Sequence, residues 1–173
     1  MAIIRPALPA DVEGIIHVHI ASWKTTYRGL VPDEVLDQLS IDRRRDWWQS
    51  ILAEDSPGVI VAEQEQHIVG FAYFGLEREQ DPIYRGELFA IYILLNFQRK
   101  GLGRSLLEAT RDGLHKMGIQ TMLVWVLSKN PARHFYEKLG GIYLRDKQVE
   151  IGGTGLQESA YGWLDLRSLR KSE

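Results

Sequence analysis

The chain contains no cysteine among its 173 residues. This absence excludes disulfides, thiolate metal sites and cysteine nucleophiles, and it is compatible with a reducing compartment. Long apolar runs are also missing, because charges interrupt each run well before the roughly 20 residues that a membrane-spanning helix needs. The stretch Met1–Pro6 lacks the basic-then-apolar order of a leader peptide. We therefore expect a soluble, cytoplasmic protein with no membrane partner.

The chain has little excess of either charge, with a formal net charge of -2. Such a balance gives no general attraction for phosphodiester backbones. The only basic triplet, Arg43-Arg44-Arg45, is expected to be a solvated helix face, so no nucleic-acid partner is predicted. With 45% hydrophobic residues, the chain suits one compact domain and leaves little room for a second.

The spacing of apolar residues predicts helices first and strands afterwards. The expected elements of the first half are, in chain order, a strand at 2–5, a helix capped by Asp11, a short helix starting near Pro32, a helix capped by Ser40, a turn at 55–58, and a hairpin of strands 59–62 and 67–74 turning at Glu65-Gln66. The second half is expected to alternate between strand and helix. Its elements are a strand at 87–95, a helix from Leu102 that ends at Gly118, a strand at 121–127, a helix opened by Asn130-Pro131 and stopped by Gly140-Gly141, and a hairpin of strands 142–151 and 156–166. The strand at 87–95 is apolar on both faces, which is typical of a central strand.

The loop Gln98–Arg104 has the chemistry of an anion site. Two glycines, Gly101 and Gly103, open a long helix directly after a buried strand. Glycine lets the main chain approach an oxygen closely, and the first helical N–H groups lack internal partners. Arg99, Lys100 and Arg104 add positive charge for phosphate groups.

Two other phosphate-binding motifs are excluded by residue identities. A dinucleotide-binding G-x-G-x-x-G would need glycine where Leu106 stands, and no string in the chain matches a Walker A loop. An isolated pair of glycines could also serve only a tight turn between strand and helix, so the loop alone does not decide the function.

With its context the loop resembles the signature Q/R-x-x-G-x-G/A of the GNAT superfamily of acyl-CoA-dependent N-acetyltransferases, matched by Gln98, Gly101 and Gly103. A second family element, an asparagine followed by a small residue and an aromatic pair, is matched by Asn130, Ala132, Phe135 and Tyr136. The resemblance covers most of the chain. It implies an α/β fold with one domain at 1–173, namely an acceptor-side half at 1–85, an acetyl-CoA-binding core at 86–141 and a C-terminal hairpin at 142–173. The sheet is expected to be mixed and mostly antiparallel, with the parallel strands 87–95 and 121–127 splayed around the cofactor.

The resemblance also implies which residues bind acetyl-CoA (coenzyme A). In the family the loop N–H groups hold the pyrophosphate and the preceding strand offers its backbone to the pantetheine arm. The residues carried over to cofactor binding are Ile91, Tyr92, Ile93, Gln98, Arg99, Lys100, Gly101, Leu102, Gly103, Arg104, Ser105, Asn130, Ala132 and Phe135. Asn130 before Pro131 is equally a good helix cap, and Phe135 is equally a core residue.

The reaction itself requires an acid and a base. An alkyl ammonium with a pKa near 10 must lose a proton before it attacks a thioester, and the departing thiolate gains from a proton. The resemblance places Tyr136 beside the sulfur as the acid. Glu87, at a spacing where some family members carry a basic glutamate, is the candidate base, with ordered water or a purely solvated strand end as the alternatives. The five histidines show no metal-ligand spacing, so no metal is expected.

The acceptor is less defined by the sequence. The family builds the acceptor pocket from the region corresponding to 21–39, so Trp23 and Tyr27 are the candidate substrate-binding residues, and the acidic stretch 77–81 is a further candidate. Aromatic and acidic groups suit a small-molecule primary amine, either a polyamine or an amino-acid-like amine, or a peptide. The sequence leaves open whether the protein forms a homodimer. The competing class is a GNAT domain that binds acyl-CoA as a sensor or scaffold without turnover.

Overall fold

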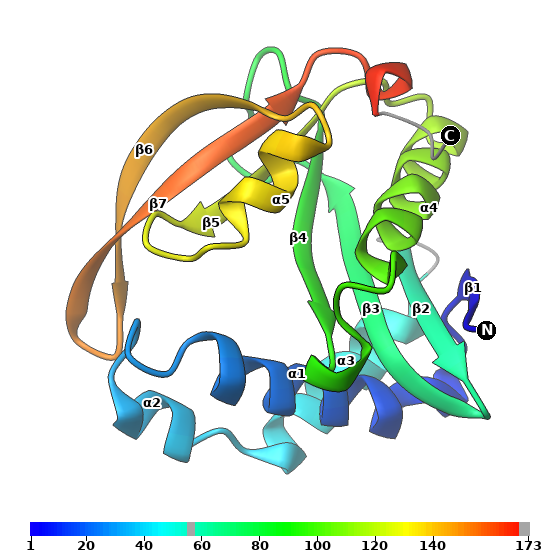
Figure 1. Cartoon of the computed structure of the whole chain (residues 1–173), viewed down its shortest axis with the longest axis vertical. Helices are drawn as coiled ribbons and strands as arrows, with labels where there is room; N and C mark the ends of the chain where they lie inside the picture. The colour runs from blue at the N-terminus through cyan, green and yellow to red at the C-terminus, as the bar shows by residue number, and fades with distance from the viewer. Residues whose placement is uncertain (55–57, 170–173) are drawn as a thin grey trace.

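The computed structural model describes residues 1–54 and 58–169. In chain order the elements are β1 (Ile3–Pro6), η1 (Pro9–Asp11), α1 (Val12–Thr26), α2 (Asp33–Asp37), α3 (Ile41–Ala53), β2 (Gly58–Gln64), β3 (His67–Leu76), β4 (Gly86–Ile93), η2 (Leu95–Phe97), α4 (Leu102–Lys116), β5 (Met122–Leu127), α5 (Arg133–Lys138), β6 (Ile142–Ile151), β7 (Thr154–Trp163) and η3 (Leu166–Ser168). The strands form one seven-stranded sheet in the order β1-β2-β3-β4-β5-β7-β6 (Figure 1). The predicted α/β architecture is confirmed.

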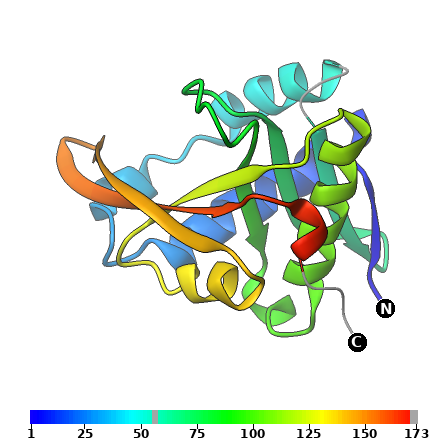
Figure 2. The same cartoon turned by 90° about the horizontal axis from the view of Figure 1, so that it is seen from above.

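Helices cover both faces of the β1–β4 half of the sheet. The alternation along β2 sends Val59 and Val61 into a cluster with α1 and α3, whereas Ile60 and Ala62 join a cluster with α4. Figure 2 shows α3 and α4 on opposite sides of the sheet. Buried apolar side chains therefore fix both layers against β2 and β3.

Two hairpins form where the sequence predicts them. Glu65 and Gln66 link β2 to β3 with φ angles of 52° and 65°. Gly152 and Gly153 link β6 to β7 with φ angles of 57° and 76°. Positive φ at both central residues gives the turn whose twist matches two antiparallel strands. The long β6–β7 ribbon curls away from the rest of the sheet (Figure 1).

The strands β4 and β5 are parallel but remain paired over a short distance only. Their register runs from Gly86 opposite Met122 to Leu88 opposite Val124, after which the two strands separate. A bulge in the β3–β4 pairing contributes, because Tyr73 pairs with Ala90 and the next pair skips Phe89. β5 meanwhile stays paired with β7 along its length. The predicted splayed pair is confirmed, and it leaves one edge of β4 without a strand partner beyond Leu88.

Some local predictions differ from the structure. Asp11 precedes α1 but makes no side-chain cap; its carboxylate instead accepts hydrogen bonds from the Arg5 guanidinium at 2.7 and 2.9 Å and from the Leu8 N–H at 2.7 Å. The strand predicted to reach residue 95 ends at Ile93, because the chain turns into η2. Ser40 does cap α3, accepting from the Arg43 N–H at 3.3 Å. The turn predicted at 55–58 lies largely outside the described residues.

Within the described parts of the chain, every helix is too short or too polar to cross a lipid bilayer.

Candidate active site

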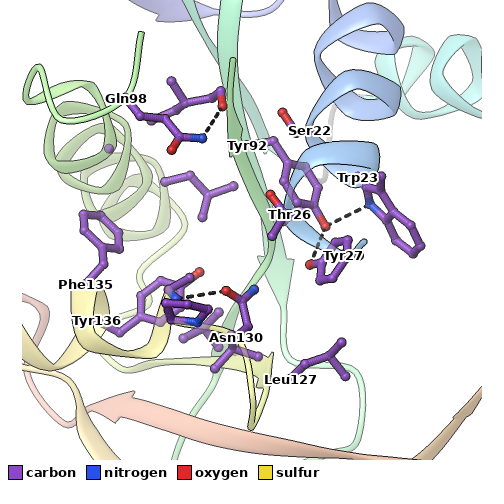
Figure 3. A pocket seen from close by; sticks show the side chains of 18 of the residues that line it. Ser22, Trp23, Thr26, Tyr27, Tyr92, Gln98, Leu127, Asn130, Phe135 and Tyr136 are labelled. Atoms are coloured by element: carbon purple, nitrogen blue, oxygen red, sulfur yellow. Dashed lines mark hydrogen bonds between the residues drawn. The ribbon is translucent and has the colours of Figure 1, made fainter. Parts of the chain in front are cut away.

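A cleft of about 1110 Å³ opens where β4 and β5 separate. Its walls come from α1, the unpaired part of β4, the start of α4, β5, α5 and one side chain of β7. Figure 3 shows Trp23, Tyr27 and Tyr92 on one side of this cleft, with Asn130, Phe135 and Tyr136 across from them. The cleft therefore joins segments that lie far apart in the sequence.

One end of the cleft, at the start of α4, has the make-up of an anion site. Gly101 caps the helix in the left-handed conformation, with φ at 84°, and no side chain caps this end. The first intrahelical bond runs from the Ser105 N–H to the Gly101 carbonyl at 3.1 Å, so the N–H groups of residues 102–104 have no helical acceptor. Arg99 and Arg104 also line the cleft here. Free N–H donors, the helix dipole and two guanidinium groups together favour phosphate.

Gly103, in the first turn of α4, is closely surrounded by the side chains of Phe135 and Ile93. A Cβ atom there would stand 3.1 Å from two carbons of the Phe135 ring and 3.6 Å from the Ile93 Cδ1. The space between α4 and α5 is thus sized for glycine, and the backbone of Gly103 stays accessible from the cleft.

Most of the predicted cofactor-binding residues line the cleft. They are Ile91, Tyr92, Ile93, Gln98, Arg99, Gly101, Gly103, Arg104, Asn130, Ala132 and Phe135. Three others do not contribute side chains to the cleft walls. The Lys100 Nζ lies 5.3 Å from the centroid of the Phe97 ring, Leu102 packs against the core, and the Ser105 hydroxyl donates to the Gly101 carbonyl at 3.4 Å.

Two polar side chains that line the cleft, Gln98 and Asn130, form hydrogen bonds with the backbone of neighbouring segments. Gln98 Nε2 donates to the Ile93 carbonyl at 2.9 Å and so fixes the end of β4 against the loop. Asn130 is buried, and its Oδ1 accepts from the Ala132 N–H at 2.9 Å. This bond lies in the turn before α5, whose N-cap residue is Ala132 without a side-chain cap, so Asn130 braces the approach to the helix and does not cap it as predicted. The amide NH₂ group of Asn130 remains able to donate to a ligand, so the pantetheine contact stays a prediction.

Tyr136 presents a phenol to the cleft from α5. Its side chain is 5% exposed, and its ring packs against Phe135 and Trp163 with centroid separations of 5.4 and 6.3 Å. The hydroxyl makes no hydrogen bond within the described parts of the chain. Burial raises the pKa of Tyr136 above its ordinary value, and the nearby Tyr27 adds to the effect. Tyr136 is therefore a neutral O–H donor at neutral pH.

Glu87 is not brought into the cleft. It is 2% exposed, and its carboxylate is held by Arg78 through Nη2 at 2.6 Å, Nε at 3.1 Å and the backbone N–H at 3.2 Å. A base needs a free lone pair within reach of the proton that it removes. A basic role for Glu87 stays a prediction, and in this arrangement the ion pair with Arg78 would first have to open.

The opposite end of the cleft is aromatic. The Trp23 Nε1–H donates to the Tyr92 hydroxyl at 3.0 Å, and the Tyr27 and Tyr92 hydroxyls are 3.2 Å apart (Figure 3). Trp23 and Tyr27 line the cleft as predicted for substrate-binding residues. Tyr92 was expected to act through its backbone, yet its side chain completes this cluster.

The acidic stretch 77–81 does not line the cleft. Glu77 accepts from the N–H groups of Glu79 and Asp81, Glu79 bonds to Lys147, and Asp81 pairs with Arg145 at 2.7 Å. These carboxylates hold the β3–β4 loop against β6. The polar lining residues that the sequence analysis did not identify are Ser22, Thr25, Thr26, Trp125, Lys138 and Glu158. The available signal was strand alternation, since Leu156, Glu158 and Ala160 share one face of β7.

His19 packs against the aromatic end of the cleft through its contact with Tyr92. It is 6% exposed, its Nδ1 accepts from the Trp48 Nε1–H at 3.1 Å, and its ring stacks on Tyr92 with centroids 5.5 Å apart. Burial, followed by the charge of Arg44, lowers the pKa of His19 to about 3. No group of side chains within 1–54 and 58–169 has the make-up of a metal site.

Protonation of His19 is expected to make the protein less stable in acid. The unfolded state, with a His pKa near 6.5, binds more protons than the folded state between pH 6.5 and 3, so stability falls as pH falls through this window. A shift of this size corresponds to a loss of about 2 kcal/mol between pH 8 and pH 5. Urea unfolding of the wild type and of His19→Gln at the two pH values measures the difference. The exposed His67, changed to Gln, is the control, and an equal pH dependence in all three proteins would contradict the prediction.

Comparisons with known proteins agree with this geometry. The sequence matches the family model described as the Acetyltransferase (GNAT) family over residues 19–141. The chain belongs to the GNAT acetyltransferase family. This confirms the predicted enzyme class, an acyltransferase, and at the level of the family its acetyl-CoA co-substrate.

Relatives of this GNAT chain carry related names. It is 37% identical to the uncharacterized N-acetyltransferase YuaI of Bacillus subtilis (strain 168), over 98% of this chain and 97% of the relative. It is 30% identical to the L-amino acid N-acyltransferase MnaT of Escherichia coli (strain K12), over 94% and 89% of the two chains. The fold matches the structure of yncA, a putative acetyltransferase from Salmonella typhimurium solved with its cofactor acetyl-CoA, with a TM-score of 0.72, 24% identity, and 96% and 94% coverage.

Proposed function

We propose that this GNAT chain transfers the acetyl group of acetyl-CoA to a primary amine of a small molecule, polyamine or amino-acid-like, or of a peptide. The observation that carries the proposal is the order of groups along one cleft. A phosphate-binding helix start lies at one end, an aromatic and polar pocket lies at the other, and the unpartnered Tyr136 hydroxyl lines the same cleft. A thioester with a long phosphorylated tail and a separate amine match these two ends.

The residues present fit coenzyme A. The free N–H groups of residues 102–104, with Arg99 and Arg104, suit the pyrophosphate, and the absence of a Cβ at Gly103 leaves room for its oxygens. The unpaired edge of β4 at Ile91–Ile93 offers backbone donors and acceptors to an amide-containing arm. When bound, the acetyl thioester supplies an activated carbonyl for attack by the amine.

The remaining chemistry concerns protons. The Tyr136 O–H donates toward the departing sulfur, because its raised pKa keeps it protonated and its oxygen has no competing partner in the described chain. The acceptor amine loses its proton to a water chain, since Glu87 is engaged by Arg78. The aromatic walls at Trp23 and Tyr27 orient the amine and exclude bulk water from the attack.

Ligand-dependent stability tests the donor half of this proposal. Acetyl-CoA at 100 times its dissociation constant is expected to stabilise the folded protein by about 2.7 kcal/mol, which a thermal unfolding scan detects as a rise in Tm. NAD at the same concentration is expected to give no comparable rise. Stabilisation by NAD and not by acetyl-CoA would overturn the assignment. A thiol-release assay over a panel of amines then separates an enzyme from a protein that only binds the cofactor.

A further inference from the structure

Glu158 is a carboxylate without a partner in the wall of the cleft. It lies on β7, is half-buried, and forms neither a side-chain hydrogen bond nor an ion pair with the described residues. The other carboxylates nearby are all engaged, because Glu87 binds Arg78, Asp81 binds Arg145 and Glu79 binds Lys147. A half-buried charge that is left uncompensated costs stability, and its presence in a cleft points to a ligand.

The surroundings of Glu158 suit a cation. Its strand neighbours are Leu127 on β5 and Lys147 on β6, and Trp125 stands two residues before Leu127 on the same face. The Trp125 ring is already covered by two cations of the protein, because the Lys147 Nζ lies 4.0 Å and the Arg145 Cζ 5.4 Å from its centroid, so the open aromatic ring is that of Tyr27. The charge of Glu158 also acts on Tyr27 across the cleft. Aromatic faces beside a carboxylate are the usual surroundings of a bound ammonium group.

The electrostatic balance at Glu158 is set by four groups from the elements around it. Burial is the largest cause that raises the pKa of Glu158, Lys147 and Arg78 lower it, and Glu79 and Glu87 raise it. Both cations are ion-paired with carboxylates of their own, and neither forms an ion pair with Glu158 in the described chain. A positive charge brought by a ligand would relieve this imbalance.

Glu158 is placed away from the reacting end of the cleft. Glu158 pairs with Leu127 at the end of β5, whereas the Tyr136 ring packs with its centroid 6.3 Å from that of Trp163, further along β7. A carboxylate against the reacting amine would hold that amine in its protonated, unreactive form. The site therefore suits a second ammonium group, remote from the one that is acetylated.

We propose that Glu158, beside the aromatic ring of Tyr27, binds a second positively charged group of the acceptor, so that the preferred acceptor is a diamine or polyamine. This inference rests on the proposed acetyltransferase function and selects one of its acceptor classes. A free amino acid is disfavoured, because its carboxylate would need a cation on this side. The two cations that act on Glu158, Lys147 and Arg78, are already bound by carboxylates of their own.

The test compares 1,5-diaminopentane with pentylamine, which has the same chain and a methyl group in place of the second amine. With the full-length enzyme and acetyl-CoA, kcat/KM for the diamine is expected to exceed that for pentylamine by about 10- to 100-fold, the range of one charge-assisted hydrogen bond. Glu158→Gln is expected to bring this ratio close to one, and Glu158→Asp to keep part of it. Glu150→Gln on β6 removes the same charge from an exposed position outside the cleft and should keep the wild-type ratio.

A binding measurement separates failure of this inference from failure of the proposed function. Calorimetric titration of 1,5-diaminopentane into the CoA-bound protein, which cannot turn over, is expected to show about tenfold or greater weakening in Glu158→Gln but not in Glu150→Gln. Equal diamine affinity in wild type and Glu158→Gln overturns the inference, and so does a wild-type preference for a free L-amino acid over both amines. Diamine binding that depends on Glu158 without any acetylation would support the cation site and refute the enzyme activity. A thermal scan of each variant confirms that it is folded.

Discussion

Gly103→Asp is expected to weaken the affinity for coenzyme A by about 100-fold or more, which corresponds to roughly 3 kcal/mol. Two causes act together. The new Cβ would stand 3.1 Å from the Phe135 ring, so either the ring or the start of α4 must shift. The carboxylate would then place a negative charge among the N–H groups that we propose for the pyrophosphate. Isothermal titration calorimetry with coenzyme A measures the loss.

Gly155→Asp is the matched control for this variant. It introduces the same side chain at a position where an added Cβ meets no atom within 4 Å and where the backbone needs no positive φ. Gly155 does not line the cleft, so the affinity for coenzyme A should stay near that of the wild type. Unchanged affinity in a folded Gly103→Asp protein would mean that the pyrophosphate binds elsewhere. Urea unfolding of both variants shows whether the substitution acts on the fold instead.

Much of the end of the cleft at the start of α4 could be predicted from the sequence because local backbone chemistry defines it. Gly101 adopts a left-handed conformation that glycine adopts without strain, and Gly103 occupies a space that any Cβ would crowd. Asn130 accepts from the Ala132 N–H in the turn just before α5. The requirements at Gly101 and Asn130 involve residues close together in the chain, so a short motif contains them, whereas the crowding at Gly103 comes from Phe135 on α5 and depends on the fold.

The acceptor side could not be predicted in the same way. Strand alternation indicates that Glu158 faces one side of β7, but it does not tell which face borders a cleft. That depends on the register between β5 and β7 and on the point where β4 leaves β5. The expectation for Glu87 came from its spacing to the loop. The engagement of its carboxylate by Arg78 depends on how the β3–β4 loop folds back, which no local pattern records.

The cluster of Trp23, Tyr27 and Tyr92 likewise could be predicted only in part from the sequence. Trp23 and Tyr27 were expected near the acceptor because the family builds its acceptor pocket from the region corresponding to 21–39, and both line the cleft. The hydroxyl of Tyr92 joins them from a central strand whose apolar pattern gave no reason to single it out. A three-residue hydrogen-bonded cluster that spans α1 and β4 is a tertiary feature. It becomes visible only when the helix is placed on the sheet.

Tyr136→Phe is expected to lower kcat by about 10²- to 10⁴-fold, the usual contribution of a general acid, while acetyl-CoA affinity and stability change little. The variant removes one oxygen and keeps the ring that packs against Phe135 and Trp163. No hydrogen bond within the described chain is lost with that oxygen, so the fold gives no reason for a large change in the free energy of unfolding. Steady-state kinetics with a good acceptor, paired with calorimetric titration of acetyl-CoA, separate the two effects.

Tyr161→Phe is the control for Tyr136→Phe. The Tyr161 hydroxyl donates to Glu137 at 3.0 Å and lies outside the cleft lining, so its loss should leave kcat near the wild-type value. The acceptor must be one that the enzyme uses well, because slow binding or attack would hide the contribution of the acid. A loss below tenfold would indicate that water protonates the departing sulfur. Wild-type kcat for Tyr136→Phe across neutral pH would show that Tyr136 is a packing residue, since a phenol that donates a proton in the slow step cannot be replaced by a hydrocarbon without cost.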